Sequence, residues 1–179
     1  KDFYGNPSSV HTAGRRAKSI VEKSRFKIAN AINASPEQIL FTSGGTESNN
    51  QVLWSMLKIP NSHVISNTIE HPAVIKVLKH LKPLGLDYSL VKVDKNGLVS
   101  LNELDKCITP NTRLVSVMMS NNEIGTIQPI KSIIKLIRDK NILMHTDAVQ
   151  CLGKIAIDTK ELDVDFLSLS AHKFYGPKG

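Results

Sequence analysis

Cysteine is scarce in this sequence: the chain contains two, Cys107 and Cys151, in separate segments. Two isolated thiols form neither a disulfide framework nor a closely spaced set of metal ligands. The sequence therefore predicts no metal site, and a cytoplasmic location is expected because thiols stay reduced there. Both cysteines are interpreted as small buried residues.

Long apolar runs are also missing. No stretch approaches the roughly 20 apolar residues of a membrane-spanning helix, so no membrane partner is expected. Residues 1–5 include neither an initiator Met nor the apolar segment of a signal peptide. The start without Met and the end on a turn motif at Gly179 suggest a piece of a longer protein.

Acidic residues are fewer than basic ones, 16 against 23, which gives a net charge of +7. Such a balance can indicate nucleic-acid binding. The lysines are spread over many segments, however, and no basic patch is interleaved with aromatic residues, which make up 5% of the chain. A solvated basic surface is the preferred interpretation, and no nucleic-acid partner is predicted.

What the sequence does contain is a regular alternation of helical and strand patterns. Apolar spacing and capping signals predict helices over residues 11–33, 46–57, 72–85 and 130–140, and a further helix that starts at residue 100. Short apolar runs predict six strands, at residues 39–42, 63–66, 88–93, 113–119, 142–145 and 164–169. This order predicts an α/β fold of three layers, α/β/α, around a mostly parallel sheet, with residues 1–179 in one domain. Ligands of such sheets bind beyond the carboxyl ends of the strands.

Two polar segments follow the first two predicted strands. Residues 42–47 contain two glycines and lead into a helix, whose free N–H groups can bind a phosphate. A tight turn with Thr46 as a plain N-cap is the alternative. His71 follows the second strand, where its ring can stack on an aromatic cofactor and move protons. A cap or surface histidine is the alternative there.

The last two predicted strands lead to charged side chains. Asp147 follows an apolar strand, so it should be partly buried and need a positive partner. A protonated pyridine nitrogen and a structural salt bridge are the two candidates. Lys173, close to Ser170 and His172 before a Gly-Pro turn, can hold an aldehyde cofactor as a Schiff base. A solvated surface lysine is the alternative.

Taken together, the motifs resemble those of NifS/IscS-type cysteine desulfurases. This family belongs to the class V aminotransferase group of pyridoxal-phosphate (PLP) enzymes of fold type I. The resemblance covers essentially the whole chain and rests on segments in family order: residues 5–11, 41–50, 70–71, 121–125, 147–150 and 170–179.

The resemblance implies PLP as the cofactor and a role for each motif. Lys173 would bind PLP covalently, Asp147 would pair with the pyridine nitrogen, and His71 would stack on the ring and move protons. Lys173 and His71 are thus the expected catalytic residues. The phosphate would be held by Gly45, Thr46, Ser170 and His172, and the ring and its phenolic oxygen would be contacted by Asn122 and Gln150.

The family converts L-cysteine into L-alanine and passes the sulfur to an enzyme cysteine as a persulfide. This sulfur supplies iron–sulfur cluster assembly and tRNA thiolation. The resemblance therefore implies L-cysteine as substrate, a homodimer if the chain folds, and sulfur-acceptor or iron–sulfur scaffold proteins as partners. The persulfide-cysteine loop, the substrate-carboxylate arginine and the small C-terminal domain of the family have no counterpart in this sequence. An incomplete large domain that binds PLP without completing turnover is expected.

Two other interpretations stay open. One keeps the fold and changes the substrate, as in a selenocysteine lyase or another class V enzyme. The other is a truncated, non-catalytic remnant. In the family's sheet the strand at residues 39–42 pairs with an antiparallel strand that follows the lysine. Without that neighbour, we expect exposed apolar side chains and a poorly stable or aggregating chain; a cooperative melt of monodisperse protein would contradict this.

Overall fold

The structure is a computed structural model that describes residues 3–177. Its internal contacts divide the chain into two compact units. The first extends to Phe41 and includes Ile157–Glu161, and the second consists of Thr42–Ala156 and the chain from Leu162 onward. Every predicted site residue, from Gly45 to Lys173, lies in the second unit. Within residues 3–177, no helix is both long enough and apolar enough to span a membrane.

The first unit is built on the predicted long helix, α1 (Thr12–Ala31), which buries Gly14, Ala17 and Ala29. The 3-10 helix η1 (Pro36–Gln38) follows with Ser35 as its N-cap, so α1 ends before it, close to the predicted end at residue 33. The second segment of this unit, Ile157–Glu161, contains most of helix α6 (Thr159–Leu162).

The predicted strand at residues 39–42 is wrong, because the structure has no strand there. The Ile39 carbonyl accepts a hydrogen bond from Arg25 of α1 instead of from a neighbouring strand. Leu40 and Phe41 are 71% and 44% exposed, as expected for a segment whose strand partner is not among the described residues. The Arg25 guanidinium lies 5.0 Å from the centre of the Phe41 ring.

The second unit contains a wholly parallel sheet, and the other five predicted strands are confirmed. Within the described residues the strand order is β2-β1-β3-β4-β5. The strands are β1 (His63–Asn67), β2 (Asp87–Val91), β3 (Thr112–Ser116), β4 (Leu143–Asp147) and β5 (Phe166–Ser168). Because all neighbours run parallel, the carboxyl ends of these strands meet at one edge of the sheet.

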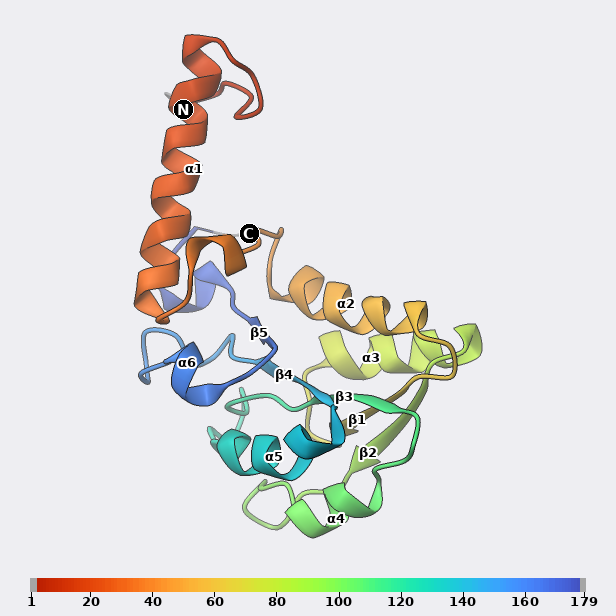
Figure 1. Cartoon of the computed structure of the whole chain (residues 1–179). Helices are drawn as coiled ribbons and strands as arrows, with labels where there is room; N and C mark the ends of the chain where they lie inside the picture. The colour runs from red at the N-terminus through yellow and green to blue at the C-terminus, as the bar shows by residue number, and fades with distance from the viewer. Residues whose placement is uncertain (1–2, 178–179) are drawn as a thin grey trace. The chain divides into compact units, whose positions relative to one another are not determined.

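Helices cover both faces of this sheet, which confirms the three-layer fold (Figure 1). Helices α2 (Gly45–Ser55) and α3 (Pro72–Leu81) pack together on one face, and α4 (Leu101–Lys106) and α5 (Ile130–Ile137) on the other. Short 3-10 helices extend several elements: η2 (Met56–Lys58), η3 (Lys82–Leu84), η4 (Arg138–Lys140) and η5 (Ala171–Phe174). The core beneath α2 and α3 includes the fully buried Leu53, Val64, Val74, Leu78 and Leu114.

Helices α3 and α4 begin at the residues whose types favour a helix start. Pro72 occupies the first turn of α3, where its missing N–H costs nothing. The Ser100 side chain accepts a hydrogen bond of 3.3 Å from the Glu103 N–H and so caps α4.

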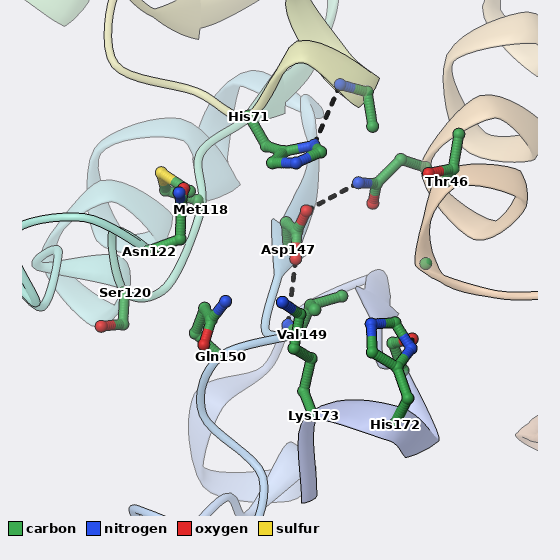
Figure 2. A pocket seen from close by; sticks show the side chains of 14 residues that line it. Thr46, His71, Met118, Ser120, Asn122, Asp147, Val149, Gln150, His172 and Lys173 are labelled. Atoms are coloured by element: carbon green, nitrogen blue, oxygen red, sulfur yellow. Dashed lines mark hydrogen bonds between the residues drawn. The ribbon is translucent and has the colours of Figure 1, made fainter. Parts of the chain in front are cut away.

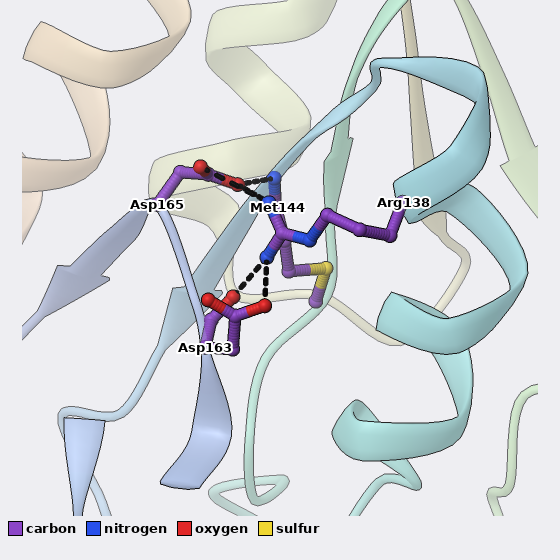
Figure 3. Close-up of polar contacts among 4 residues, drawn as sticks. All are labelled: Arg138, Met144, Asp163 and Asp165. Atoms are coloured by element: carbon purple, nitrogen blue, oxygen red, sulfur yellow. Dashed lines mark hydrogen bonds and ion pairs between the residues drawn. The ribbon is translucent and has the colours of Figure 1, made fainter. Parts of the chain in front are cut away.

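Strand β5 is three residues long, and the segment that enters it is fastened by Arg138 (Figure 3). The Arg138 guanidinium donates to the Asp163 carbonyl and pairs with the carboxylates of Asp163, at 3.0 Å, and Asp165, at 3.4 Å. Asp165 also accepts a 2.7 Å hydrogen bond from the Met144 N–H of β4. These contacts tie the start of β5 to β4 and to the end of α5.

We expect Arg138→Lys to lower the free energy of unfolding by about 1 kcal/mol, because one ammonium group cannot contact both carboxylates and the carbonyl. Arg138 is 38% exposed, so solvent screening keeps the effect small. Urea denaturation measures it. Arg16→Lys, on the exposed surface of α1, is the control and should change stability by less than about 0.5 kcal/mol. Equal effects of the two substitutions would contradict the role given to Arg138.

Candidate functional site

The second unit contains a pocket of about 220 Å³ at the carboxyl ends of the strands. It lies between the N-terminal ends of α2 and α3 and the loops that follow β3, β4 and β5. The whole predicted set of site residues lines it: Gly45, Thr46, His71, Asn122, Asp147, Gln150, Ser170, His172 and Lys173. Segments more than a hundred residues apart in the sequence thus meet in one place.

Asp147, the last residue of β4, forms the floor of the pocket and is 7% exposed. Its Oδ1 accepts a 3.0 Å hydrogen bond from the Val149 N–H, and its Oδ2 accepts one of 2.6 Å from the Asn49 amide (Figure 2). No cationic side chain among residues 3–177 forms an ion pair with it, so the salt-bridge alternative is not observed. A buried carboxylate in this state favours a positively charged ligand atom.

His71 is both the N-cap of α3 and a wall of the pocket. Its Nδ1 accepts a 3.1 Å hydrogen bond from the Ala73 N–H, and its ring lies across the pocket from Lys173, next to Asp147 (Figure 2). Because Nδ1 is an acceptor, the neutral ring carries its proton on Nε2. The cap interpretation is therefore confirmed, and it also fixes the orientation of the ring.

The N-terminal end of α2 approaches the pocket closely because of two glycines. Gly44, the N-cap, has φ 155°, which L side chains rarely adopt. A Cβ atom on Gly45 would lie 2.7 Å from Val149 Cγ2. The first N–H groups of this 11-residue helix have no intrahelical acceptor, so they can bind an anion. Thr46 lies within the first turn, and its assignment as N-cap is wrong.

The segment after β5 supplies the remaining polar groups. Ser170 is buried, and its Oγ hydrogen-bonds with His172 Nδ1 at 2.8 Å. His172 and Lys173 are exposed in η5, and Lys173 has a side chain that lines the pocket. The predicted motif continues to Lys178 and Gly179, which lie outside the described residues.

Asn49 is a pocket residue that the sequence interpretation missed. It is 1% exposed and lines the pocket, and its Oδ1 has no hydrogen-bond partner among the described residues. The available signal was its position four residues before Leu53 on the buried face of α2, where an apolar side chain is the rule. A polar residue in such a stripe indicates a polar partner, here Asp147.

A buried polar network lies behind Asp147. The His145 ring hydrogen-bonds with Ser116 through Nδ1, at 2.8 Å, and with Ser168 through Nε2, at 3.1 Å. Ser168 in turn hydrogen-bonds with Ser48 of α2 at 2.8 Å. Burial lowers the pKa of His145 to about 4, so the ring is uncharged near neutral pH. The network joins β3, β4, β5 and α2 beneath the pocket.

Comparison with known proteins gives the class to which this chain belongs. The aminotransferase class-V family matches it over residues 1–179. The chain therefore belongs to this family, whose members depend on PLP.

Its relatives narrow the class further. The chain is 46% identical over 182 residues to the cysteine desulfurase IscS of Dictyoglomus turgidum, covering 100% of this chain and 46% of the relative. It is 47% identical over 181 residues to the mitochondrial cysteine desulfurase of Saccharomyces cerevisiae, covering 99% and 36%. A solved NifS-like protein superposes with a TM-score of 0.95 at 42% identity, covering 100% and 50%. The chain thus spans about half the length, or less, of these relatives.

The His145 network predicts that stability falls as the pH is lowered. Between about pH 6.5 and about pH 4 the unfolded chain binds a proton on this histidine and the folded chain does not. Wild-type protein should therefore lose about 2 kcal/mol more than His145→Gln between about pH 7 and about pH 4.5. Urea denaturation at both pH values measures this. His80→Gln, at an exposed position, should behave as wild type, and parallel losses in all three proteins would contradict the prediction.

Proposed function

We propose that residues 1–179 form the PLP-binding part of the large domain of a cysteine desulfurase. The proposed reaction of the whole protein converts L-cysteine into L-alanine and transfers the sulfur to an enzyme thiol. The observation that carries the proposal is the convergence of Lys173, Asp147 and His71 on one pocket at the N-terminal end of α2. The names of the relatives, cysteine desulfurases, support the choice of reaction within the family.

The pocket fits PLP in its charges and its donors. The buried Asp147 carboxylate offers a partner for a protonated ring nitrogen, and Val149 and Asn49 hold it in place. At the other end, the N–H groups of Gly45 and Thr46 offer a site for a phosphate, where a helix N-terminus favours negative charge. We assign Ser170 and His172 to the same phosphate, since they hydrogen-bond to each other at the pocket wall.

When bound, PLP withdraws electrons from the substrate carbon next to its amino group. The side chains of the protein would hold and orient the cofactor and would move protons near it. Lys173 would hold the cofactor through its aldehyde group, and its Nζ would be placed to exchange a proton with the substrate. His71 can exchange a proton at Nε2 only, because Nδ1 is held by the Ala73 N–H.

We assign Asn122 and Gln150 to the polar substituents of the ring. Gln150 Oε1 accepts a 2.8 Å hydrogen bond from Lys154 Nζ, which orients the amide. Its NH₂ group is then turned to donate, as a phenolic oxygen requires. Asn122 is exposed and lies on the same side of the pocket as Gln150 (Figure 2).

Neither described cysteine suits the role of sulfur acceptor. Burial and, to a smaller extent, the negative charge of Asp147 raise the pKa of Cys151 to about 11, so this thiol stays protonated and unreactive. Cys107 ends α4 and does not line the pocket. We therefore propose that the acceptor thiol belongs to a segment other than these residues.

The proposed partners are those of the family: L-cysteine, a second copy of the protein, and a sulfur-acceptor or iron–sulfur scaffold protein. The proposed location is the cytoplasm, and the matching relatives also include proteins named as mitochondrial.

The cofactor assignment predicts a visible absorption band when the purified protein is mixed with PLP, and a shift of this band on adding L-cysteine. Lys173→Ala should abolish the band, because no other lysine among residues 3–177 lines the pocket. After borohydride reduction, mass spectrometry should find the cofactor on the peptide that contains Lys173. Lys76→Ala, at an exposed position on α3, is the control and should keep the band. A band that survives in Lys173→Ala, or no band in wild type, would refute the assignment.

The contact between Asn49 and Asp147 predicts weaker PLP binding in Asn49→Ala. Loss of one hydrogen bond to a buried charge should raise the Kd for PLP by about tenfold. Quenching of protein fluorescence during titration with PLP gives the Kd. Asn30→Ala, at an exposed position of α1, should leave it unchanged. An unchanged Kd in Asn49→Ala would show that Asp147 does not need this amide.

A further inference from the structure

Glu70 is a buried acid next to the pocket that has no role in the proposed function. It is 7% exposed. Its Oε1 accepts two short hydrogen bonds, from the Asn67 amide at 2.5 Å and from the Met118 N–H at 2.6 Å. Its Oε2 is buried and has no hydrogen-bond partner among residues 3–177. A buried carboxyl group with one oxygen that lacks a hydrogen-bond partner destabilises the fold, so its presence points to a function.

The two hydrogen bonds join two neighbouring segments that both contribute residues to the pocket. Asn67 ends β1, and Glu70 lies in the turn that leads to His71 and α3. Met118 follows β3, lines the pocket and precedes the loop that contains Asn122. Glu70 therefore fixes the turn to the loop.

Asn121 makes a second tie between the same two segments. Its Nδ2 donates a 3.0 Å hydrogen bond to the Ile69 carbonyl in the His71 turn. Its Oδ1 accepts hydrogen bonds from the Glu123 and Ile124 N–H groups, which shapes the loop around Asn122. Two contacts therefore set the separation of His71 and Asn122, and Glu70 is the one that can change its charge.

The surroundings favour the uncharged form of Glu70. Burial raises its pKa to about 8, the negative charge of Asp147 on β4 acts in the same direction, and the two hydrogen bonds that Glu70 accepts oppose the rise. The hydrogen-bonded neighbours, Asn67 and the Met118 backbone, are uncharged, and His71 is the adjacent residue in the turn. In the uncharged form the proton would be on Oε2, because Oε1 accepts both hydrogen bonds. Ionisation would place a second negative charge near Asp147 with one oxygen unsolvated.

We propose that Glu70 is a positioning residue, whose carboxyl group holds the His71 turn against the Met118 segment that follows β3 and so fixes the positions of His71 and Asn122 at the pocket. It does this in the uncharged form, and ionisation loosens the tie. The inference rests on the proposed function, because the position of His71 matters through its contact with PLP. It makes the pocket sensitive to pH in the mildly alkaline range.

The test compares wild type, Glu70→Gln and Glu103→Gln in the full native polypeptide. Glutamine keeps an oxygen that can accept from Asn67 and Met118, and it is uncharged at every pH. Glu103, exposed on α4, provides the same substitution away from the pocket. The Kd for PLP is measured by fluorescence between about pH 7 and about pH 9. At each pH the wild-type Kd is divided by the Kd of the variant, so that pH effects common to both proteins cancel.

We expect the ratio of the wild-type Kd to the Glu70→Gln Kd to rise about tenfold over this interval, because one proton is lost from the binding-competent state near pH 8. The corresponding ratio for Glu103→Gln should stay constant. Glu70→Ala, which removes both accepted hydrogen bonds, should weaken PLP binding at every pH. Parallel loss of affinity in wild type and Glu70→Gln would overturn the proposal.

A second measurement separates this inference from the cofactor assignment. In the cofactor-free protein, the NMR signals of the Met118 amide and the His71 ring should shift with a midpoint near pH 8 in wild type, and this step should be absent in Glu70→Gln. If wild type forms no lysine-dependent band with PLP, the cofactor assignment fails and these signals alone decide the role of Glu70. Absence of a step near pH 8 in the wild-type signals would overturn the proposal.

Discussion

The parallel pairing of β3, β4 and β5 is the constraint on which the site depends. Its register places His145 beside Ser116 and Asp147 beside Ser168. Ser170 and η5 then start at a fixed distance beyond Asp147. A slip of one residue would turn Asp147 to the opposite face of the sheet, away from α2, because side chains alternate along a strand. The contacts of Arg138 act on this register from the far end of β5, since they fix where the strand begins.

Polar groups occupy the part of the core where an ordinary α/β protein would place apolar ones. His145, Asn49 and Glu70 are all buried behind or beside the pocket, and two of them have an oxygen without a partner among the described residues. Such groups contribute little to stability, and incomplete hydrogen bonding makes them costly. They do restrict the orientation of the neighbouring side chains. The protein thus sacrifices stability beneath the pocket and gains a fixed arrangement of the residues that line it.

The site could best be predicted from the sequence where polar residues directly follow a strand. Parallel strands bring their carboxyl ends together, so polar residues after strands could be assigned to one site before any contact was known, and the family resemblance added their roles. The roles of Asn49 and Glu70 could not be predicted in this way, because their hydrogen-bond partners, Asp147 and Met118, lie 98 and 48 residues away in the sequence. The strand predicted at residues 39–42 is wrong for a related reason. A strand forms only beside a neighbouring strand, and local apolar character does not show whether one is present. The alternative of Thr46 as N-cap is wrong because Gly44 begins the helix with a backbone conformation that composition alone does not reveal.

The close approach of Gly45 to Val149 has a consequence for how this site can vary among related proteins. Residue 45 begins the helix that faces the phosphate end of the pocket, and residue 149 follows the strand that ends at Asp147. With 2.7 Å between a Cβ atom on residue 45 and the valine methyl group, position 45 cannot accept a side chain while residue 149 is valine. The two positions should therefore covary: an alanine at position 45 is compatible with a smaller residue at position 149, and a glycine at position 45 with a branched one. Evolution of this pocket is confined to paired substitutions at that point.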